Sequence, residues 1–184
     1  MPISLDGSGL INGLELPTDS IQPGLVHINT TTFSSVSIFN LDNVFSSIYD
    51  SYRIILSASQ TQSAGSAIRI KFRANGNTIS SNYGFSYINS TTSSAVGGLT
   101  SYDNWDIGAF GSGNFGQSTV EIGGPFLLGQ TTGTSMSGNY INQSSLYIRG
   151  LHQTDPTSFD GFSTYVQSGT ITGTVRVYGY RNSQ

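Results

Sequence analysis

The sequence predicts an all-β fold, a β-sandwich or jelly-roll-like domain of about ten short strands with an extended N-terminal arm. Three observations lead to this prediction. Residues 168–182 alternate between apolar and polar side chains with a period of two, which is typical of a strand with unlike faces. Similar short segments, rich in β-branched and aromatic residues, recur at roughly ten-residue spacing with turn residues between them. No segment offers a convincing helical pattern.

The final strand also indicates which of its faces lies inside. Ile171, Val175 and Val177 point one way together with Gly173 and Gly179, while threonine, tyrosine and arginine side chains point the other way. Because this strand comes last in the chain, a sheet must already exist for it to join. The two glycines on the inner face predict the close approach of another backbone or of a large aromatic ring.

Residues 1–24 differ in pattern from the rest of the chain and are predicted to form an arm separate from the sandwich domain, residues 25–184. Short extended pieces alternate here with the turn dipeptides Asp-Gly at 6–7 and Asn-Gly at 12–13. A segment this short cannot bury a core of its own, so its apolar side chains need a partner in the main domain or in a neighbouring subunit. The alternative is a partly disordered leader. We expect the arm to anchor the protein or to contact sister subunits through Leu10, Ile11, Leu14 and Leu16.

Strand-like segments succeed one another along the sandwich domain. Residues 51–59 are nearly continuously apolar, which predicts a central strand covered on both faces. Residues 42–50 are predicted to be a connector with room for one helical turn, and residues 91–98 a loop of Ser, Thr and Gly. Strands are expected at residues 24–29, 32–40, 51–59, 67–74, 83–88, 118–123, 124–128, 136–141, 145–152, 161–166 and 168–182.

Residues 67–74 carry three cations on one strand face. Isoleucine and phenylalanine alternate here with Arg69, Lys71 and Arg73, so the basic side chains are predicted to face outward. A solvated strand face accounts for this pattern, and an ion-pair ladder between subunits is the alternative.

The composition excludes several classes of function. Charged residues make up 9% of the chain, against roughly 25% in ordinary soluble domains. A surface of Ser, Thr, Asn, Gln and Gly favours neutral contacts, such as sugars or a protein partner. The formal charge of −3 and the scarcity of lysine and arginine argue against nucleic-acid binding. No apolar run approaches the ~18 residues of a transmembrane helix, so we expect no membrane insertion.

The same composition bears on assembly. The chain has no cysteine, which excludes disulfides, thiolate metal sites and a cysteine nucleophile. Low charge with a single lysine is unfavourable for the solubility of a monomer, and exposed sheet edges need protection. Both points favour an obligate homo-oligomer.

No motif of the sequence predicts a catalytic residue, a metal ligand or a cofactor. Residues 111–116 match G-x-G-x-x-G, but a strand-like segment comes next and no acidic residue lies at the required offset. These glycines are therefore predicted to form a mobile loop or a close-packed turn. His27 and His152 lie far apart without a G-x-S-x-G elbow. The acidic residues lack the spacing of a calcium loop, and nothing selects a glycosidase pair among them.

One segment supports a sharper hypothesis about a ligand. A sugar needs a flat apolar surface to stack on and hydrogen-bonding groups at its edge. An aromatic residue beside amide and carboxylate groups offers both. The alternative is that the only tryptophan simply fills the core. The candidates for a ligand or host-surface contact are Tyr102, Asp103, Asn104, Trp105 and Asp106.

Three stretches resemble a known family. Residues 42–56 resemble the N-x-F-S-x-x-Y-D-x-Y-x-I segment of a β-rich domain found in bacteriophage tail-fibre and related virion proteins, notably those of cyanophages. Residues 168–181 are similar to the closing S-G-T-I-x-G-x-I-x-V-Y-G-Y-R strand of that domain. Residues 5–14 look like the D-G-x-G-x-I-x-G leader common at the start of such proteins. The family-like part runs from about residue 24 to the end.

The resemblance implies a non-enzymatic component of the virion. It implies a jelly-roll-like sandwich in a symmetric homo-oligomer, with a trimer favoured, and other virion proteins of the capsid or tail as partners. One departure is the length, because tail fibres are usually long and this chain has 184 residues with a short arm. That departure favours a small protein attached to the capsid or tail.

The residues and the resemblance lead to three hypotheses about function. The first is a tail-fibre-like adhesin for host attachment, with a host-surface glycan as a possible ligand. The second is a capsid decoration or cement protein that stabilises the shell. The third is a carbohydrate-binding or carbohydrate-active protein on the same sandwich. An exposed Trp105 would favour a lectin, whereas a buried Trp105 under a flat outer surface would favour decoration.

Overall fold

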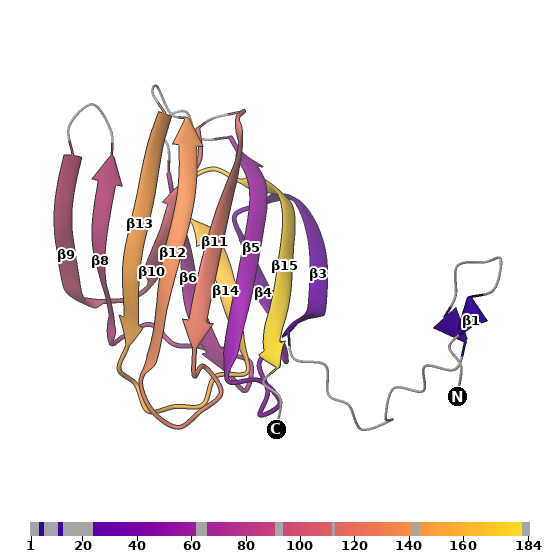
Figure 1. Cartoon of the computed structure of the whole chain (residues 1–184). Helices are drawn as coiled ribbons and strands as arrows, with labels where there is room; N and C mark the ends of the chain where they lie inside the picture. The colour runs from indigo at the N-terminus through magenta and orange to yellow at the C-terminus, as the bar shows by residue number, and fades with distance from the viewer. Residues whose placement is uncertain are drawn as a thin grey trace.

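The computed structural model describes residues 4–5, 11–12, 24–61, 66–90, 94–111, 113–140 and 144–181. In these residues every regular element is a strand, and thirteen of the strands form two antiparallel sheets packed face to face (Figure 1). The predicted all-β sandwich is therefore confirmed. Within the described part of the chain, no helix exists that is long and apolar enough to cross a membrane.

The larger sheet has eight strands, and the first and last strands of the sandwich domain lie side by side at one of its edges. The last strand, β15, thus pairs with a neighbour on each side. The order across the sheet is β3 (Gly24–Val36), β15 (Ile171–Arg181), β5 (Ser51–Gln60), β11 (Phe115–Gly123), β12 (Thr131–Tyr140), β13 (Ser144–Gln153), β8 (Tyr83–Ser90) and β9 (Ser94–Tyr102).

The smaller sheet covers only part of the larger one. Among the strands of the larger sheet, its edge strand β10 contacts mainly β12. Strands β8 and β9 lie beyond β10 on one side (Figure 1). The inner faces of β8 and β9 are therefore not fully covered by a second layer. The order of the smaller sheet is β10 (Trp105–Ala109), β6 (Ala67–Ala74), β14 (Gly161–Val166) and β4 (Ile38–Leu41), with β7 (Asn77–Thr78) paired to β6.

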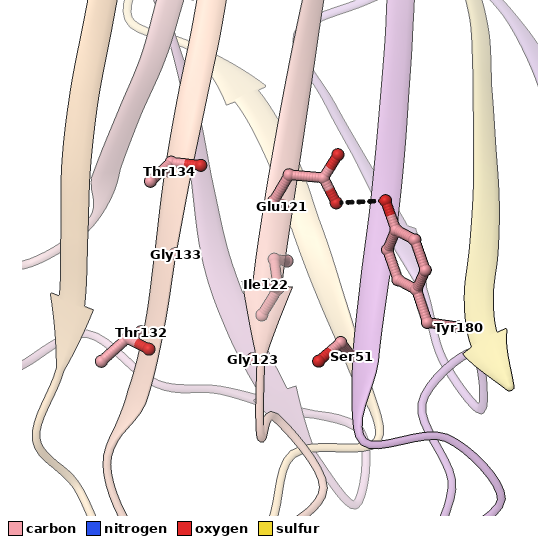
Figure 2. Close-up of a pocket in the computed structure, with 8 residues that line it drawn as sticks. All are labelled: Ser51, Glu121, Ile122, Gly123, Thr132, Gly133, Thr134 and Tyr180. Atoms are coloured by element: carbon pink, nitrogen blue, oxygen red, sulfur yellow. Dashed lines mark hydrogen bonds between the residues drawn. The ribbon is translucent and has the colours of Figure 1, made fainter. Parts of the chain in front are cut away.

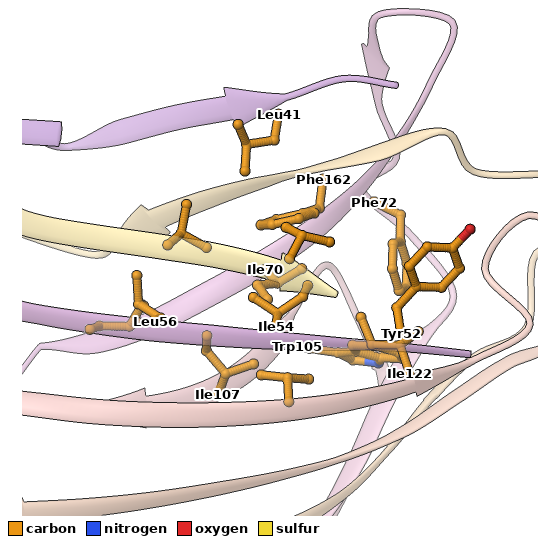
Figure 3. Packing of buried hydrophobic residues seen from close by; sticks show 14 of the residues in the cluster. Leu41, Tyr52, Ile54, Leu56, Ile70, Phe72, Trp105, Ile107, Ile122 and Phe162 are labelled. Carbon is orange, nitrogen blue, oxygen red and sulfur yellow. The ribbon is translucent and has the colours of Figure 1, made fainter. Parts of the chain in front are cut away.

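The core lies between the sheets and is centred on aromatic rings (Figure 3). The ring of Phe72 packs at 4.7 Å against Trp105 and at 4.7 Å against Phe159. Such edge-to-face and stacked contacts add to the burial of large apolar area. Trp105 is 0% exposed, and its Nε1 donates a hydrogen bond to the carbonyl oxygen of His152 at 2.8 Å. The alternative that the tryptophan fills the core is therefore confirmed.

The two inward glycines of the final strand confirm their predicted role. A side chain at Gly173 would collide with the backbone carbonyl of Ser57 on β5. A side chain at Gly179 would collide with the ring of Tyr49. One glycine thus admits a neighbouring backbone and the other an aromatic ring.

Several local predictions were wrong. Residues 42–50 are a connector, as predicted, but they contain no helix, and the N–H groups of Val44 and Phe45 both donate to the carbonyl of Asp160. Residues 124–128, predicted as a strand, are a turn. The predicted loop at 91–98 contains the start of β9, because pairing with β8 overrides a composition poor in strand formers.

The outer side chains of two strands also differ from expectation. Strand β5 is central, but only one of its faces is covered, so Arg53 and Ile55 remain partly exposed. On β6, Arg73 is buried and pairs with Asp42 at 2.6 Å, while Lys71 pairs with Asp103 at 2.9 Å. Two of the three cations of this face, Lys71 and Arg73, thus pair with acidic residues of the same chain.

The arm is described only in part. Strands β1 (Ser4–Leu5) and β2 (Ile11–Asn12) pair with each other, with Leu5 opposite Ile11. The other predicted anchoring residues, Leu10, Leu14 and Leu16, lie outside the described residues. The anchoring role and the division at residue 24 stay predictions.

Candidate functional site

The outer face of the larger sheet presents polar side chains in rows that cross the strands. Period-two alternation sends every second residue of a strand to this face, and the strand register sets which of them are neighbours. One row runs from Tyr180 on β15 to Ser51 on β5, Gly123 on β11 and Thr132 on β12. Side chains from four strands therefore meet across the sheet.

A second row lies next to the first. It runs from Tyr178 on β15 through Arg53 on β5 and Glu121 on β11 to Thr134 on β12. Arg53 and Glu121 are directly opposite each other, as are Glu121 and Thr134. An opposite-charge pair in this position is favourable, and it fixes both side chains over the sheet.

The two rows enclose a hollow of about 520 Å³ on the outer face (Figure 2). Gly123 lies between Ser51 and Thr132, so no side chain rises from the floor at this point. Figure 2 shows Glu121 and Tyr180 on one side of the hollow and the two threonines on the other. The residues that line it are Ser51, Glu121, Ile122, Gly123, Thr132, Gly133, Thr134 and Tyr180.

Three side chains form a connected polar cluster at this hollow, which we call the Arg53–Glu121–Tyr180 cluster. The Nε of Arg53 donates to Oε1 of Glu121 at 2.5 Å, and the hydroxyl of Tyr180 donates to Oε2 at 2.9 Å. The guanidinium of Arg53 also lies 5.7 Å from the centre of the Tyr180 ring. Each carboxylate oxygen thus has one fixed donor and retains a lone pair for another.

The cluster changes the protonation behaviour of two of its members. The hydrogen bond to Glu121 raises the pKa of Arg53 above its ordinary value. Burial, together with the hydrogen bond to Glu121 as the next largest cause, raises the pKa of Tyr180. Both groups therefore keep their protons at neutral pH and act as donors to the carboxylate.

This arrangement suits a ligand that carries hydroxyl groups. Glu121 offers acceptor positions, Ser51 and the two threonines offer donors, and Tyr180 adds an aromatic face, while Arg53 holds Glu121 in place. Among the lining residues only Glu121 is a carboxylate. Glycoside hydrolysis needs two carboxyl groups across the scissile bond, and one is not enough. In the described part of the chain, no group of three His, Cys, Asp or Glu side chains is placed to hold a metal ion.

The five ligand candidates, residues 102–106, do not lie at one site in the structure. Trp105 and Asn104 are both 0% exposed, so as ligand contacts these two candidates are wrong. The reason is that β10 is the edge of the smaller sheet and turns the indole into the core. Asp103 is exposed and paired with Lys71. Tyr102 and Asp106 line a different groove, at the open end of the sandwich.

Sequence reasoning missed the Arg53–Glu121–Tyr180 cluster. Glu121 is 68 residues from Arg53 and 59 residues from Tyr180 along the chain. The alternation of each strand indicated that Tyr180 faces outward, but nothing local indicated which strands are neighbours. The order β15, β5, β11 supplies that information.

Comparisons with known proteins do not assign a function to this hollow. No family model matches the chain. No curated protein matches it either. Among solved structures, the galectin LEC-6 of Caenorhabditis elegans is similar over 81% of this chain and 95% of that chain, at 12% sequence identity and a TM-score of 0.37. A likeness at this level carries no argument about function.

Proposed function

We propose that this protein is a non-enzymatic bacteriophage virion structural protein that acts as a tail-fibre-like adhesin for host attachment. The observation that carries the adhesin role is the hollow at the Arg53–Glu121–Tyr180 cluster, which we propose binds a host-surface glycan. The virion assignment rests on the resemblance of residues 42–56 and 168–181 to the virion domain. A homo-oligomer, with a trimer favoured, belongs to the same proposal.

The physical argument for a glycan is the match between donors, acceptors and geometry. Sugar hydroxyls both donate and accept, so a site for them needs both kinds of group on a preorganised surface. Strand pairing fixes the backbone beneath Arg53, Glu121 and Tyr180, and their mutual hydrogen bonds fix the side chains. Little conformational entropy is then lost when a ligand binds.

The lining of the hollow supports the non-enzymatic role. Both oxygens of Glu121 already accept hydrogen bonds from Arg53 and Tyr180. Glycoside hydrolysis with a pair of carboxyl groups needs a second Asp or Glu across the scissile bond. No second carboxyl group is found among the described residues that line the hollow.

The test is binding of the full chain to an array of bacterial surface saccharides. Glu121→Gln keeps the shape of the side chain and removes its charge, and Tyr180→Phe keeps the ring and removes the hydroxyl. Since a hydrogen bond to a charged group contributes about 1.5–3 kcal/mol, we expect Glu121→Gln to weaken binding at least ~10-fold. Arg176→Gln is the control. Arg176 lies on β15 like Tyr180 and also faces outward, but it is opposite Ile55 and therefore two rows away from Tyr180.

Two results would contradict the glycan role. One is the absence of saturable binding by the wild-type protein to any saccharide on the array. The other is saccharide binding by Glu121→Gln and by Tyr180→Phe that is as strong as binding by the control, Arg176→Gln.

Capsid decoration is the second candidate, and a different part of the outer face favours it. Met136, Ile148, Ile88 and Val96 are opposite one another on β12, β13, β8 and β9 and form an apolar row. Their exposed fractions are 55%, 42%, 55% and 79%. A contiguous apolar surface of this kind is typical of a contact with another protein.

Localisation on the intact particle distinguishes the two candidates. Gold labelling of a tag after Gln184, or a cryo-EM reconstruction, would place the protein. Density confined to the tail is expected for the adhesin. Density at regular positions over the shell would contradict the adhesin role and support capsid decoration. Absence from the particle would overturn the virion assignment.

A further inference from the structure

A second groove lies at the open end of the sandwich, where the smaller sheet stops at β10. It has a volume of about 310 Å³, at the lower end of the range for small-ligand sites. Side chains of β8, β9 and β13 form one wall, and Arg69 of β6 and Asp106 of β10 form the other. This groove is on the inner face of the larger sheet, opposite to the hollow at the Arg53–Glu121–Tyr180 cluster.

Arg149 is the central polar group of this groove. Its side chain is 6% exposed, and its Nη2 lies 3.5 Å from Oδ1 of Asp106. Its Nε and Nη1 are buried and have no hydrogen-bond partner among the described residues. A buried donor without a partner is destabilising, and more so when the group is charged. The guanidinium lies 4.8 Å from the centre of the Tyr147 ring, which holds it in place without satisfying these donors.

The other lining groups add to the excess of donors. Arg69 donates from Nη2 to Gln167 at 3.2 Å, but its Nε is buried without a partner among the residues that the structure describes. The groove therefore holds two guanidinium groups and one carboxylate, Asp106. Burial raises the pKa of Asp106, and Arg149, Gly108 and Arg69 oppose this rise. Because the guanidinium groups outnumber the carboxylate, the lining favours an added negative charge.

The remaining groups indicate the kind of anion. Tyr87, Tyr102 and Tyr147 line the groove with aromatic rings. The side-chain oxygen of Asn89 is buried there and has no partner in the described part of the chain, so it can accept a hydrogen bond from a hydroxyl. Aromatic faces and an amide beside a guanidinium with donors left unpaired by the described residues match a sugar ring that carries a carboxylate.

We propose that this groove is a second binding site, specific for an acidic saccharide whose carboxylate pairs with Arg149. One of the two donors of Arg149 that lack a partner among the described residues, Nε or Nη1, donates to the carboxylate, a tyrosine ring packs against the sugar, and Asn89 binds a hydroxyl. The site is separate from the hollow on the outer face, and it does not depend on the function proposed for that hollow.

The test is titration of the full chain with D-glucuronate, with D-glucose as the uncharged isostere and glutamate as a carboxylate without a sugar ring. Binding is measured by calorimetry and by NMR shifts of the Tyr147 and Arg149 backbone amides. We expect saturable binding of glucuronate, at least ~10-fold weaker binding of glucose and of glutamate, and weakening of the glucuronate affinity by added salt.

Two variants test the residues. Arg149→Lys keeps the charge and loses the planar fork, and Asn89→Asp places a like charge against the ligand without removing a buried group. We expect each to weaken glucuronate binding at least ~10-fold, while Arg176→Gln, which removes an arginine from the outer face, leaves it unchanged. Should Arg149→Lys fail to fold, Asn89→Asp decides the matter.

Four results would overturn the proposal. Equal binding of glucose and glucuronate would remove the role of the carboxylate. Glutamate binding as tight as that of glucuronate would remove the saccharide. A complete lack of saturable binding, or binding that Asn89→Asp does not change, would remove the site.

Discussion

Two arginine–carboxylate pairs lie on opposite faces of the larger sheet and differ in burial. Arg53 and Glu121 are 37% and 36% exposed and are 2.5 Å apart, whereas Arg149 and Asp106 are 6% and 22% exposed and 3.5 Å apart. The exposed pair is closed and hydrogen-bonded, while the buried pair leaves two donors of Arg149 without a partner among the described residues. The same chemical pair is therefore a minor contributor to stability on one face and a strongly coupled unit on the other.

The largest effect is expected from removal of the buried carboxylate. Asp106→Ala removes the oxygen that faces the buried Arg149 and accepts from the N–H of Gly108, so the free energy of unfolding should fall by about 1–3 kcal/mol. Urea denaturation measures the loss. Asp103→Ala, which removes the exposed partner of Lys71, is the matched control and should cost about 1 kcal/mol or less. Equal losses in the two variants would show that burial does not separate these pairs.

Removal of the arginine should cost less than removal of the aspartate. Arg149→Met leaves Asp106 alone, and burial already raises the pKa of this carboxyl, so it can take up a proton and become neutral. Replacement of both residues, Arg149→Met with Asp106→Leu, should recover most of the stability that Asp106→Leu alone loses. A double-mutant cycle measures this coupling, and purely additive losses would contradict it.

The buried pair also predicts how stability depends on pH. Because the pKa of Asp106 is raised in the folded state above its ordinary 3.8, the folded state holds this proton more tightly than the unfolded state. The contribution of the protonated carboxyl is fully present below pH 3.8 and is lost as pH rises through the raised pKa. Unfolding of the wild type and Asp106→Asn at several pH values should therefore show the wild type losing stability relative to the variant as pH rises. A constant difference would contradict the raised pKa.

The comparison of the two faces also separates what the sequence could predict from what it could not. The alternation in residues 168–181 is local, and it sufficed to identify the inner face and the tight packing at Gly173 and Gly179. Local sequence could not show whether Trp105 packs in the core or contacts a ligand. It depends on β10 being a sheet edge and on a hydrogen bond to His152, 47 residues away.

Both candidate sites show the same limit. Arg53, Glu121 and Tyr180 meet only because β5 lies between β11 and β15, and a period of two contains no information on strand order. Two residues of the predicted segment 102–106, Tyr102 and Asp106, do line a groove. They lie there because β9 and β10 flank the place where the smaller sheet ends.

On the exposed face, loss of the ion pair should have a small effect on stability. Glu121→Gln keeps one oxygen to accept from Arg53, and its new amide N–H can donate to the Tyr180 hydroxyl. Because exposed pairs contribute about 0–1 kcal/mol, the free energy of unfolding should fall by no more than about 1 kcal/mol. The loss should shrink further in high salt, because salt screens exposed charges. Thermal or urea unfolding at low and high salt measures both effects. A loss near that of Asp106→Ala would mean that Glu121 stabilises the fold and is not free to serve a ligand.

The smallest effect is expected in the apolar row beside the hollow. Ile148 lies on the outer face of β13, opposite Met136 and Ile88, and keeps 42% of its surface exposed. Ile148→Thr preserves the β-branched shape and removes apolar surface that the isolated chain leaves in water, so unfolding of the isolated chain should change by about 0.5 kcal/mol or less. The matched change Ile54→Thr, on the covered face of β5, should cost several times more, because Ile54 is 1% exposed. If Ile148→Thr were as costly as Ile54→Thr, the outer face would already be covered in solution, and the row would belong to a subunit contact that strengthens the case for decoration.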